Sequence, residues 1–163
     1  MPDAPPTLTI VIPTYERRAA LARLLAGLAP QLAGLRDRVD VLVVVDGSRD
    51  GSAELVAGMD YPVALAAVTQ PNAGLAAARN RGLADAAGDV VWFLDDDMVP
   101  AAGLVARHLA VHVRPGPRLL MGPCPPPPEV RMVPMVREWA KETAQQHPGN
   151  GDYVESFKYF KLD

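Results

Sequence analysis

NAGLAAARNRGLADAAGDVVWFLDDD, residues 72–97, joins a helix signal directly to a strand signal. Asn72 is a good N-cap residue, and the pattern after it predicts a helix that runs to about Ala87 and stops at Gly88. Residues 89–94 are mostly apolar and predict a short buried strand. A helix followed so closely by a strand is typical of an α/β protein.

The same alternation extends toward the N-terminus. Residues 7–12, TLTIVI, are β-branched or apolar throughout, which predicts a buried strand of a parallel sheet, and Pro13 and Thr14 are expected to end it. Leucines at 21, 24, 25 and 28 follow the spacing of one helical face. Further strands are expected at 39–45 and 63–68, and a short helix at 52–57. This order predicts an α/β fold with a mostly parallel sheet and right-handed crossovers.

Composition and charge narrow the classes of protein. The chain has 163 residues, of which 49% are hydrophobic and 21% charged, as in a soluble globular domain of ordinary size. A net charge of −3 gives no basic footprint for nucleic acid or for an anionic membrane. The start of the chain lacks a signal-peptide pattern, and the apolar runs are too short to span a bilayer. With Cys124 as the lone cysteine, we expect a cytoplasmic protein without a nucleic-acid partner, and peripheral membrane association stays open.

The last part of the chain differs in composition. Residues after Pro100 continue with a helical pattern, and 118–121 are expected to form a fifth strand. The proline-rich segment 123–128 fits neither a central strand nor a helix, and we interpret it as a stiff polyproline connector. A further helix is expected at about 130–146. We therefore place a domain boundary between residues 122 and 123.

Polar residues follow three of the predicted strands. They are Pro13, Thr14, Tyr15 and Glu16 after the first strand, Asp46 after the second, and an aspartate triplet, residues 95–97, after the fourth. Because ligands bind at the carboxyl ends of the strands in an open parallel sheet, we expect these three clusters to meet along one edge. This convergence is the physical argument for a binding site.

The aspartate triplet is the sharpest signal. Three adjacent carboxylates at the end of a buried strand repel one another, so their ionisation needs a counter-charge or good solvation. Mg²⁺ or Mn²⁺ would supply that charge, because hard cations prefer oxygen ligands and often share one or two carboxylates with substrate phosphates. The alternative is a solvated acidic turn that caps the next helix. The position after a buried strand favours the cation site.

Three further positions carry alternatives that the residues alone leave open. Asp46 can accept hydrogen bonds from a base or ribose, as acids at this position of a nucleotide-binding fold commonly do, or it can form a turn with the glycine and serine after it. The helix start at 72–74 can offer backbone N–H groups to a phosphate. Arg79 can point toward the site or lie on the surface as a solvated cation.

His108 and His112 are four residues apart on a predicted helix, a spacing that can chelate Zn²⁺. Leu109 stands where the metalloprotease pattern has glutamate, so we interpret the pair as surface or partner-facing histidines. Cys124 lies among prolines with no activating group evident, and no role is assigned to it.

Three motifs resemble those of the family-two glycosyltransferases of the GT-A fold. They are TIVIPTYERR at 9–18, VLVVVDGSRDGS at 41–52 and QPNAGLAAARNRGLADAAGDVVWFLDDDMVP at 70–100, and with the helix that follows the resemblance covers about residues 7–113. It implies a Rossmann-like three-layer sandwich around a mostly parallel sheet. It also implies metal-dependent transfer of a hexose-like sugar from a UDP- or GDP-linked donor to a glycan, lipid or small-molecule acceptor, with inversion at the anomeric carbon.

The resemblance also implies a role for each site residue. A metal, Mn²⁺ or Mg²⁺, would be coordinated by Asp97, the last of the family's D-x-D, together with Asp95, and would hold the donor diphosphate. Asp46 would contact the base, and Asp95 and Asp96 would face the ribose and the sugar. The donor-binding set is therefore Pro13, Thr14, Tyr15, Glu16, Asp46, Gly74, Arg79, Asp95 and Asp96.

Two departures from the family pattern matter. Val45 replaces the first of two acids that the family often has before the glycine and serine at 47–48. The family's acceptor half and its catalytic base have no recognisable counterpart among the later acids, such as Glu138, Glu142, Asp152 and Glu155. We therefore expect a nucleotide-sugar-binding domain at 1–122, with 123–163 as a connector and the beginning of an acceptor region that is truncated at the C-terminus.

Two alternative functions stay open from the sequence. A truncated fragment would bind a nucleotide sugar and transfer nothing. A sugar-phosphate nucleotidyltransferase has a related architecture, but that class generally uses a glycine-rich basic loop after the first strand, and residues 14–18 (TYERR) contain no glycine.

Overall fold

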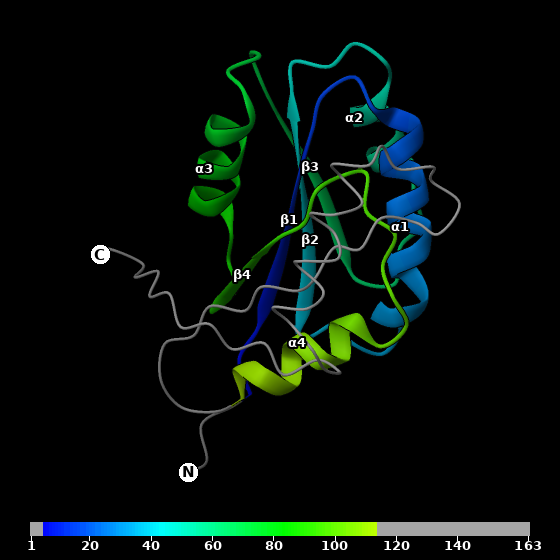
Figure 1. Ribbon diagram of the computed structural model, residues 1–163, viewed down its shortest axis with the longest axis vertical. Coiled ribbons are helices and arrows are strands. Elements are labelled where there is room, and N and C mark those ends of the chain that lie inside the picture. The colour runs from blue at the N-terminus through cyan, green and yellow to red at the C-terminus, as the bar shows by residue number, and fades with distance from the viewer. Residues whose placement is uncertain (1–4, 114–163) are drawn as a thin grey trace, which may run out of the picture. The chain divides into compact units, whose positions relative to one another are not determined.

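The computed structural model describes residues 5–113, in which strands and helices alternate (Figure 1). The elements are β1 (Leu8–Thr14), α1 (Arg18–Leu32), β2 (Val39–Asp46), α2 (Ser52–Ala57), β3 (Ala64–Gln70), α3 (Leu75–Asp85), β4 (Val90–Phe93) and α4 (Leu104–His112). The predictions for the domain boundary, the fifth strand, the proline-rich segment, Cys124, the helix at 130–146 and the later acids all fall outside the described residues.

The four strands form one parallel sheet in the order β3-β2-β1-β4. β1 lies inside the sheet, where Leu8 pairs with Val39 of β2 and with Val90 of β4. All three strand pairs are parallel, which confirms the predicted α/β fold. The chain leaves β1 toward β2 and β3 and returns on the other side of β1 as β4, so the strand order reverses between β1 and β4.

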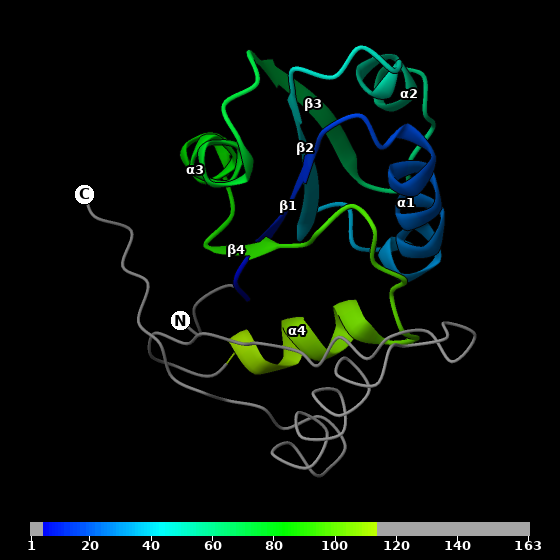
Figure 2. The same cartoon turned by 45° about the horizontal axis from the view of Figure 1, so that its top comes forward.

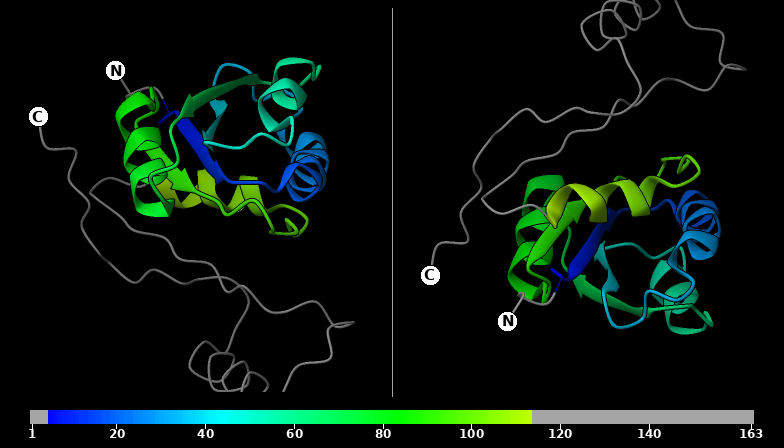
Figure 3. Two further views of the ribbon diagram at one scale, coloured as in Figure 1. Left: turned by 90° about the horizontal axis from the view of Figure 1, so that it is seen from above. Right: turned by 90° about the horizontal axis from the view of Figure 1, so that it is seen from below.

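Helices cover both faces of the sheet and give three layers (Figure 2). α1, α2 and α4 supply the larger core on one face, and the predicted leucine face of α1 is fully buried there. Figure 3 shows α4 beside β4 and reaching toward α1. α3 covers the opposite face, where Ala78 packs with Val11 and Val44 of the sheet. The expected three-layer arrangement is therefore present.

α3 lies close to the sheet because Gly82 has no side chain. A Cβ atom at Gly82 would overlap Val11 Cγ1 and would lie 3.2 Å from Val44 Cγ2. Valine side chains have little freedom at χ1, so they cannot turn away at low cost. The close approach brings the start of α3 toward the ends of β1 and β2.

The predicted end of the first strand was wrong. β1 continues through Pro13 and Thr14, which pair with β2. Leu94 N–H donates to Val11 O, so the odd-numbered residues of β1 direct their backbone polar groups toward β4. The N–H that Pro13 lacks would therefore fall beyond the last residue that pairs with β4, and its absence costs no ladder hydrogen bond.

α3 also begins later than predicted. It spans Leu75–Asp85 with Gly74 as its N-cap, and Asn72 lies outside it. The backbone N–H groups of Ala73 and Gly74 donate to the Asp46 carboxylate over 2.9 and 2.8 Å, which holds this segment against β2 in a non-helical conformation. A tertiary contact therefore overrides the local capping signal.

His108 lies in the core, so its prediction as a surface histidine was wrong. The residue is 5% exposed, and its ring stacks on Trp92 of β4 with the two centroids 4.0 Å apart. Burial lowers the pKa of His108 to about 4, and the nearby His112 adds to the effect. Within residues 5–113, no group of three histidine, cysteine, aspartate or glutamate side chains could hold a metal by itself, and no helix is long and apolar enough to cross a membrane.

Candidate functional site

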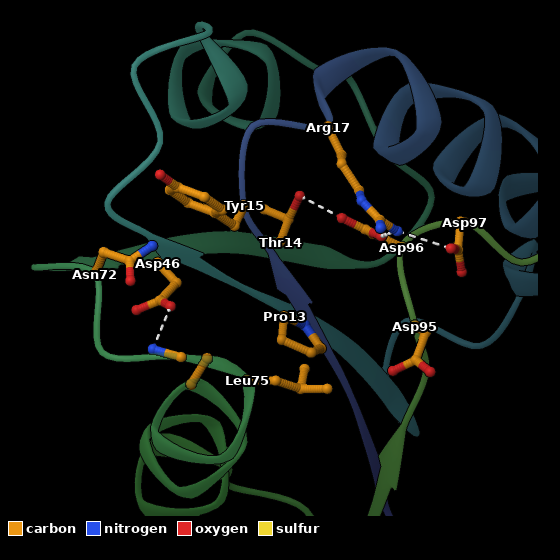
Figure 4. A pocket seen from close by; sticks show the side chains of 12 residues that line it. Pro13, Thr14, Tyr15, Arg17, Asp46, Asn72, Leu75, Asp95, Asp96 and Asp97 are labelled. Carbon is orange, nitrogen blue, oxygen red and sulfur yellow. Dashed lines mark hydrogen bonds and ion pairs between the residues drawn. The ribbon is translucent and has the colours of Figure 1, made fainter.

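A cavity of about 450 Å³ opens at the carboxyl ends of β1, β2 and β4, in the crevice where the strand order reverses (Figure 4). This is the place where open α/β sheets bind ligands, and the volume is typical of a small-molecule site. The three predicted polar clusters meet there. The lining residues are Pro13, Thr14, Tyr15, Arg17, Asp46, Asn72, Gly74, Leu75, Ala78, Asp95, Asp96 and Asp97.

The end of β1 is tied to the aspartate triplet by a buried hydrogen bond. Thr14 Oγ1 donates to Asp96 Oδ2 over 2.7 Å, and the two residues are 3% and 5% exposed. Burial raises the pKa of Asp96 above its usual value, and the Thr14 hydrogen bond and the Arg17 charge act against that rise. Asp96 is therefore the inward, anchored member of the triplet.

Arg17 supplies a cation that the sequence analysis did not assign to the site. Its Nη1 atom lies 3.3 Å from Asp96 Oδ1 and 2.7 Å from Asp97 Oδ2. Asp96 and, after it, Asp97 raise the pKa of Arg17 above its usual value. A signal was available, because Arg17 is the first cation after the strand end that was expected to line the site.

Arg79 reaches the triplet from α3. Its Nη2 atom lies 2.6 Å from Asp95 Oδ1, so it points toward the site, which is one of the two placements left open by the sequence. Arg79 does not line the cavity itself, whereas Asp95 does. Its Nε atom is a buried donor that has no hydrogen-bond partner within residues 5–113. The counter-charge that the triplet requires thus comes from two arginines of the same chain.

The turn after β1 is held in an unusual conformation. Glu16 has a φ of 51°, in the left-handed region that non-glycine residues seldom adopt. Its backbone N–H donates to Ser48 Oγ over 2.9 Å, and its Oε1 accepts from the backbone N–H of Arg49 over 2.8 Å. Glu16 was expected to line the cavity, but it is not among the lining residues. It instead fixes the turn that presents Tyr15 and Arg17 to the cavity.

Asp46 organises the segment before α3. Its Oδ1 accepts from Gln70 Nε2 over 2.8 Å and from Ala73 N, while its Oδ2 accepts from Gly74 N. Burial favours a higher pKa for Asp46, but the three donated hydrogen bonds prevail and lower it below its usual value. The Gly74 amide, expected to meet a phosphate, donates to Asp46 instead.

Two apolar side chains complete the cavity wall. Tyr15 and Leu75 both line it and are 51% and 52% exposed. Figure 4 shows the Tyr15 ring at the end of β1 near Asp46 and Asn72, and the Leu75 side chain near Pro13. The cavity thus has an apolar part beside Asp46 and a charged part at the triplet.

The sequence matches a known family over most of its length. Residues 9–151 match the family described as Glycosyl transferase family 2. The chain belongs to this family. It is 32% identical over 160 residues to Validoxylamine A glucosyltransferase of Streptomyces hygroscopicus subsp. jinggangensis (strain 5008), a match that covers 94% of this chain and 38% of that protein. The chain therefore spans well under half of the length of this relative.

Two solved structures share the family 2 fold. The mannosyltransferase PcManGT of Pyrobaculum calidifontis, in complex with GDP-Man and Mn²⁺, is 28% identical with a TM-score of 0.54 and covers 69% of this chain and 33% of its own. S. aureus TarS 1-349, in complex with UDP-GlcNAc, is 25% identical with a TM-score of 0.58 and covers 64% of this chain and 30% of its own. The expected GT-A-like α/β fold is confirmed.

The carboxylate oxygens of the aspartate triplet suit a hard divalent cation that shares its coordination with a phosphate. Asp95 and Asp97 both line the cavity, with 41% and 55% of their side chains exposed, and both offer carboxylate oxygens. Two carboxylates completed by substrate phosphates and water are a common Mg²⁺ arrangement.

Proposed function

We propose that the described domain binds a nucleotide-diphosphate sugar in the cavity between β1 and β4, as the donor half of a metal-dependent, inverting glycosyltransferase. One observation carries the proposal: the aspartate triplet meets Arg17 and Arg79 at the crevice of a family 2 fold. Carboxylates that can hold a divalent ion, beside the Arg17 guanidinium that lines the cavity and can bind phosphate, complement a diphosphate. Complexes of two similar proteins, one with GDP-Man and Mn²⁺ and one with UDP-GlcNAc, support it.

The apolar part of the cavity suits the base of the donor. Tyr15 and Leu75 offer exposed apolar surface on which a base can lie. Asp46 Oδ2 accepts one hydrogen bond within the described chain, from Gly74 N, so a second lone pair remains for an N–H group of the base. A UDP- or GDP-linked donor placed this way directs its diphosphate toward the triplet.

The charged part of the cavity suits the leaving group. Asp97 and Asp95 would hold Mn²⁺ or Mg²⁺, which when bound neutralises charge on the departing nucleoside diphosphate. Asp96 stays buried and orients Arg17 beside that charge. An acceptor hydroxyl of a glycan, lipid or small molecule would attack the anomeric carbon from the opposite side, with its proton taken by a carboxylate base outside this cavity.

Calorimetric titration of the full chain with UDP and GDP, each with and without Mn²⁺, tests donor binding. We expect Asp97→Asn to lose about tenfold or more of the Mn²⁺-dependent affinity, because the ion loses a charged ligand. Asp85→Asn is the matched control, since Asp85 pairs with Arg81 on the exposed side of α3. If Mn²⁺ strengthens nucleotide binding equally in both variants, the metal role of Asp97 is wrong.

A donor-hydrolysis assay separates a transferase from a binding fragment. Family 2 chemistry predicts slow, Mn²⁺-dependent release of sugar from a UDP- or GDP-sugar in the absence of an acceptor. Tight binding of the donor with no release in the full chain would favour a binding module that transfers nothing.

A further inference from the structure

Arg17 and a divalent ion compete for the same carboxylate. Arg17 Nη1 lies 2.7 Å from Asp97 Oδ2, and Asp97 is the carboxylate that the proposed function gives to the metal. A second cation on Asp97 would lie close to the guanidinium, and like charges at that separation repel. The ion pair between Arg17 and Asp97 therefore opposes metal binding in the nucleotide-free protein.

We propose that Arg17 neutralises Asp97 in place of a divalent ion until a donor binds, and that it then releases Asp97 and binds the donor diphosphate while it stays on Asp96. This inference rests on the proposed function. It makes Arg17 both a competitor of the metal and a ligand of the diphosphate. Arg17 should therefore weaken the binding of the metal alone and strengthen the binding of the nucleotide.

The two carboxylates on Arg17 differ in their freedom to move. The Asp96 side chain is 7% exposed and is held by Thr14, whereas the Asp97 side chain is 55% exposed (Figure 4). The backbone of Arg17 is fixed by the Glu16 turn and its hydrogen bonds to the loop after β2. Release of Asp97 therefore requires only rotation of an exposed side chain, and Asp96 keeps the guanidinium at the cavity.

The Arg17 guanidinium has further N–H groups that can donate hydrogen bonds to a diphosphate. Both of its ion pairs use Nη1, and within residues 5–113 neither Nε nor Nη2 of Arg17 has a hydrogen-bond partner. Those two groups form the edge of the guanidinium that binds phosphate oxygens in pairs. The side chain is 55% exposed and lines the cavity, so this edge is accessible to a ligand.

The test compares Arg17→Gln, Arg17→Lys and Arg18→Gln in the full chain. Arg18 is the matched control, because it is the next exposed arginine and its guanidinium lies beside Gly51, away from the triplet. Two affinities are measured: that for Mn²⁺ alone, by electron paramagnetic resonance of the unbound ion, and that for UDP or GDP in saturating Mn²⁺, by calorimetry. Thermal unfolding of each variant verifies that it is folded.

For Arg17→Gln we expect Mn²⁺ alone to bind about three- to tenfold more tightly than to the unchanged chain, because its competitor is gone. We expect the nucleotide to bind about tenfold or more weakly, because a charged phosphate ligand is lost. Arg17→Lys should keep the Mn²⁺ affinity close to that of the unchanged chain and weaken the nucleotide less. Arg18→Gln should change neither affinity.

An unchanged or weaker Mn²⁺ affinity in Arg17→Gln would overturn the competition. An unchanged nucleotide affinity would overturn the diphosphate contact. In either case, binding of nucleotide and Mn²⁺ by the unchanged chain would leave the proposed function standing. If the unchanged chain binds neither UDP nor GDP with Mn²⁺, the proposed function and this inference both fail.

Discussion

Thr14 Oγ1 donates a 2.7 Å hydrogen bond to Asp96 Oδ2 across 82 positions of the chain. The bond links the end of β1 to the loop after β4, beyond the last backbone pair between those strands. It is buried, so water does not compete for either atom. The alignment of the aspartate triplet with the rest of the cavity depends on this contact.

Replacing Thr14 with valine should therefore destabilise the fold. Valine keeps the shape of the side chain but leaves a buried carboxylate with one donor fewer, which costs about 1–3 kcal/mol. Urea denaturation at neutral pH measures the loss. Thr14→Ser retains the hydroxyl and should recover part of it, and equal stability of the valine and serine variants would contradict a role for the hydrogen bond.

Asp46→Asn should loosen the segment between β3 and α3. Asparagine offers one acceptor oxygen where three donors converge, so we expect a loss of about 1–3 kcal/mol at pH 7. The folded-state pKa of Asp46 is lowered, so its ionised form stabilises the fold above the usual carboxyl range. That contribution is lost as the pH falls through the lowered pKa.

Denaturation of the Asp46→Asn variant and the unchanged chain at several acidic pH values checks this sign. The stability gap between them should shrink as the pH is lowered. A gap that is constant with pH would show that the charge of Asp46 contributes nothing. Asp85→Asn, at an exposed ion pair on α3, should shift stability by only about 0.5 kcal/mol or less.

His108 should make the fold sensitive to mild acid. Its pKa is lowered to about 4 in the folded chain and returns to about 6.5 on unfolding, so the unfolded state takes up a proton first as the pH falls. Stability should decline between these two values, by about 1.4 kcal/mol for each unit of pKa difference. His108→Phe keeps an aromatic ring on Trp92 and should flatten the dependence.

The melting temperature at a series of pH values from neutral to about 4.5 measures the effect of His108. His112→Gln is a useful comparison, because the charge of His112 adds to the lowering of the His108 pKa. That variant should retain most of the pH dependence. An identical pH dependence in His108→Phe and in the unchanged chain would rule out His108 as its source.

Gly82→Ala should destabilise the contact between α3 and the sheet. Alanine is the better helix former, yet its Cβ would overlap Val11 Cγ1, and overpacking of this kind typically costs about 1–3 kcal/mol. Combining it with Val11→Ala removes the overlapping atom. In a double-mutant cycle, the double variant should lose less unfolding free energy than the two single variants lose in total. Strictly additive losses would contradict the clash.

Much of the fold could be predicted from the sequence, because the patterns that indicate its helices and strands are local. The leucine spacing of α1 was predicted from periodicity and the four strands from apolar runs, and the structure contains both. The fourth strand, predicted to be buried, is instead partly exposed along β4. The meeting of the polar clusters also followed from one rule about strand ends in parallel sheets. These predictions needed no knowledge of which side chains touch.

The errors arose where a distant partner decides the outcome. Pro13 stays in β1 because its missing N–H falls where β4 has ended, and α3 begins late because Asp46 binds the preceding amides. His108 is buried because Trp92, on another element, offers a stacking surface. Arg17 was overlooked because its role depends on two carboxylates 79 and 80 positions away. None of these contacts leaves a periodic trace in the sequence.

The order of the strands has a consequence for synthesis of the protein. Among the strands of residues 5–113, β1 and β4 are neighbours in the sheet but are the first and the last in the sequence. A nascent chain on the ribosome therefore cannot close the cavity until residue 97 has left the exit tunnel, however early its first three strands associate. If the proposed nucleotide binds, it can stabilise only a chain whose cavity has formed, and its binding would shift late folding intermediates toward the native state.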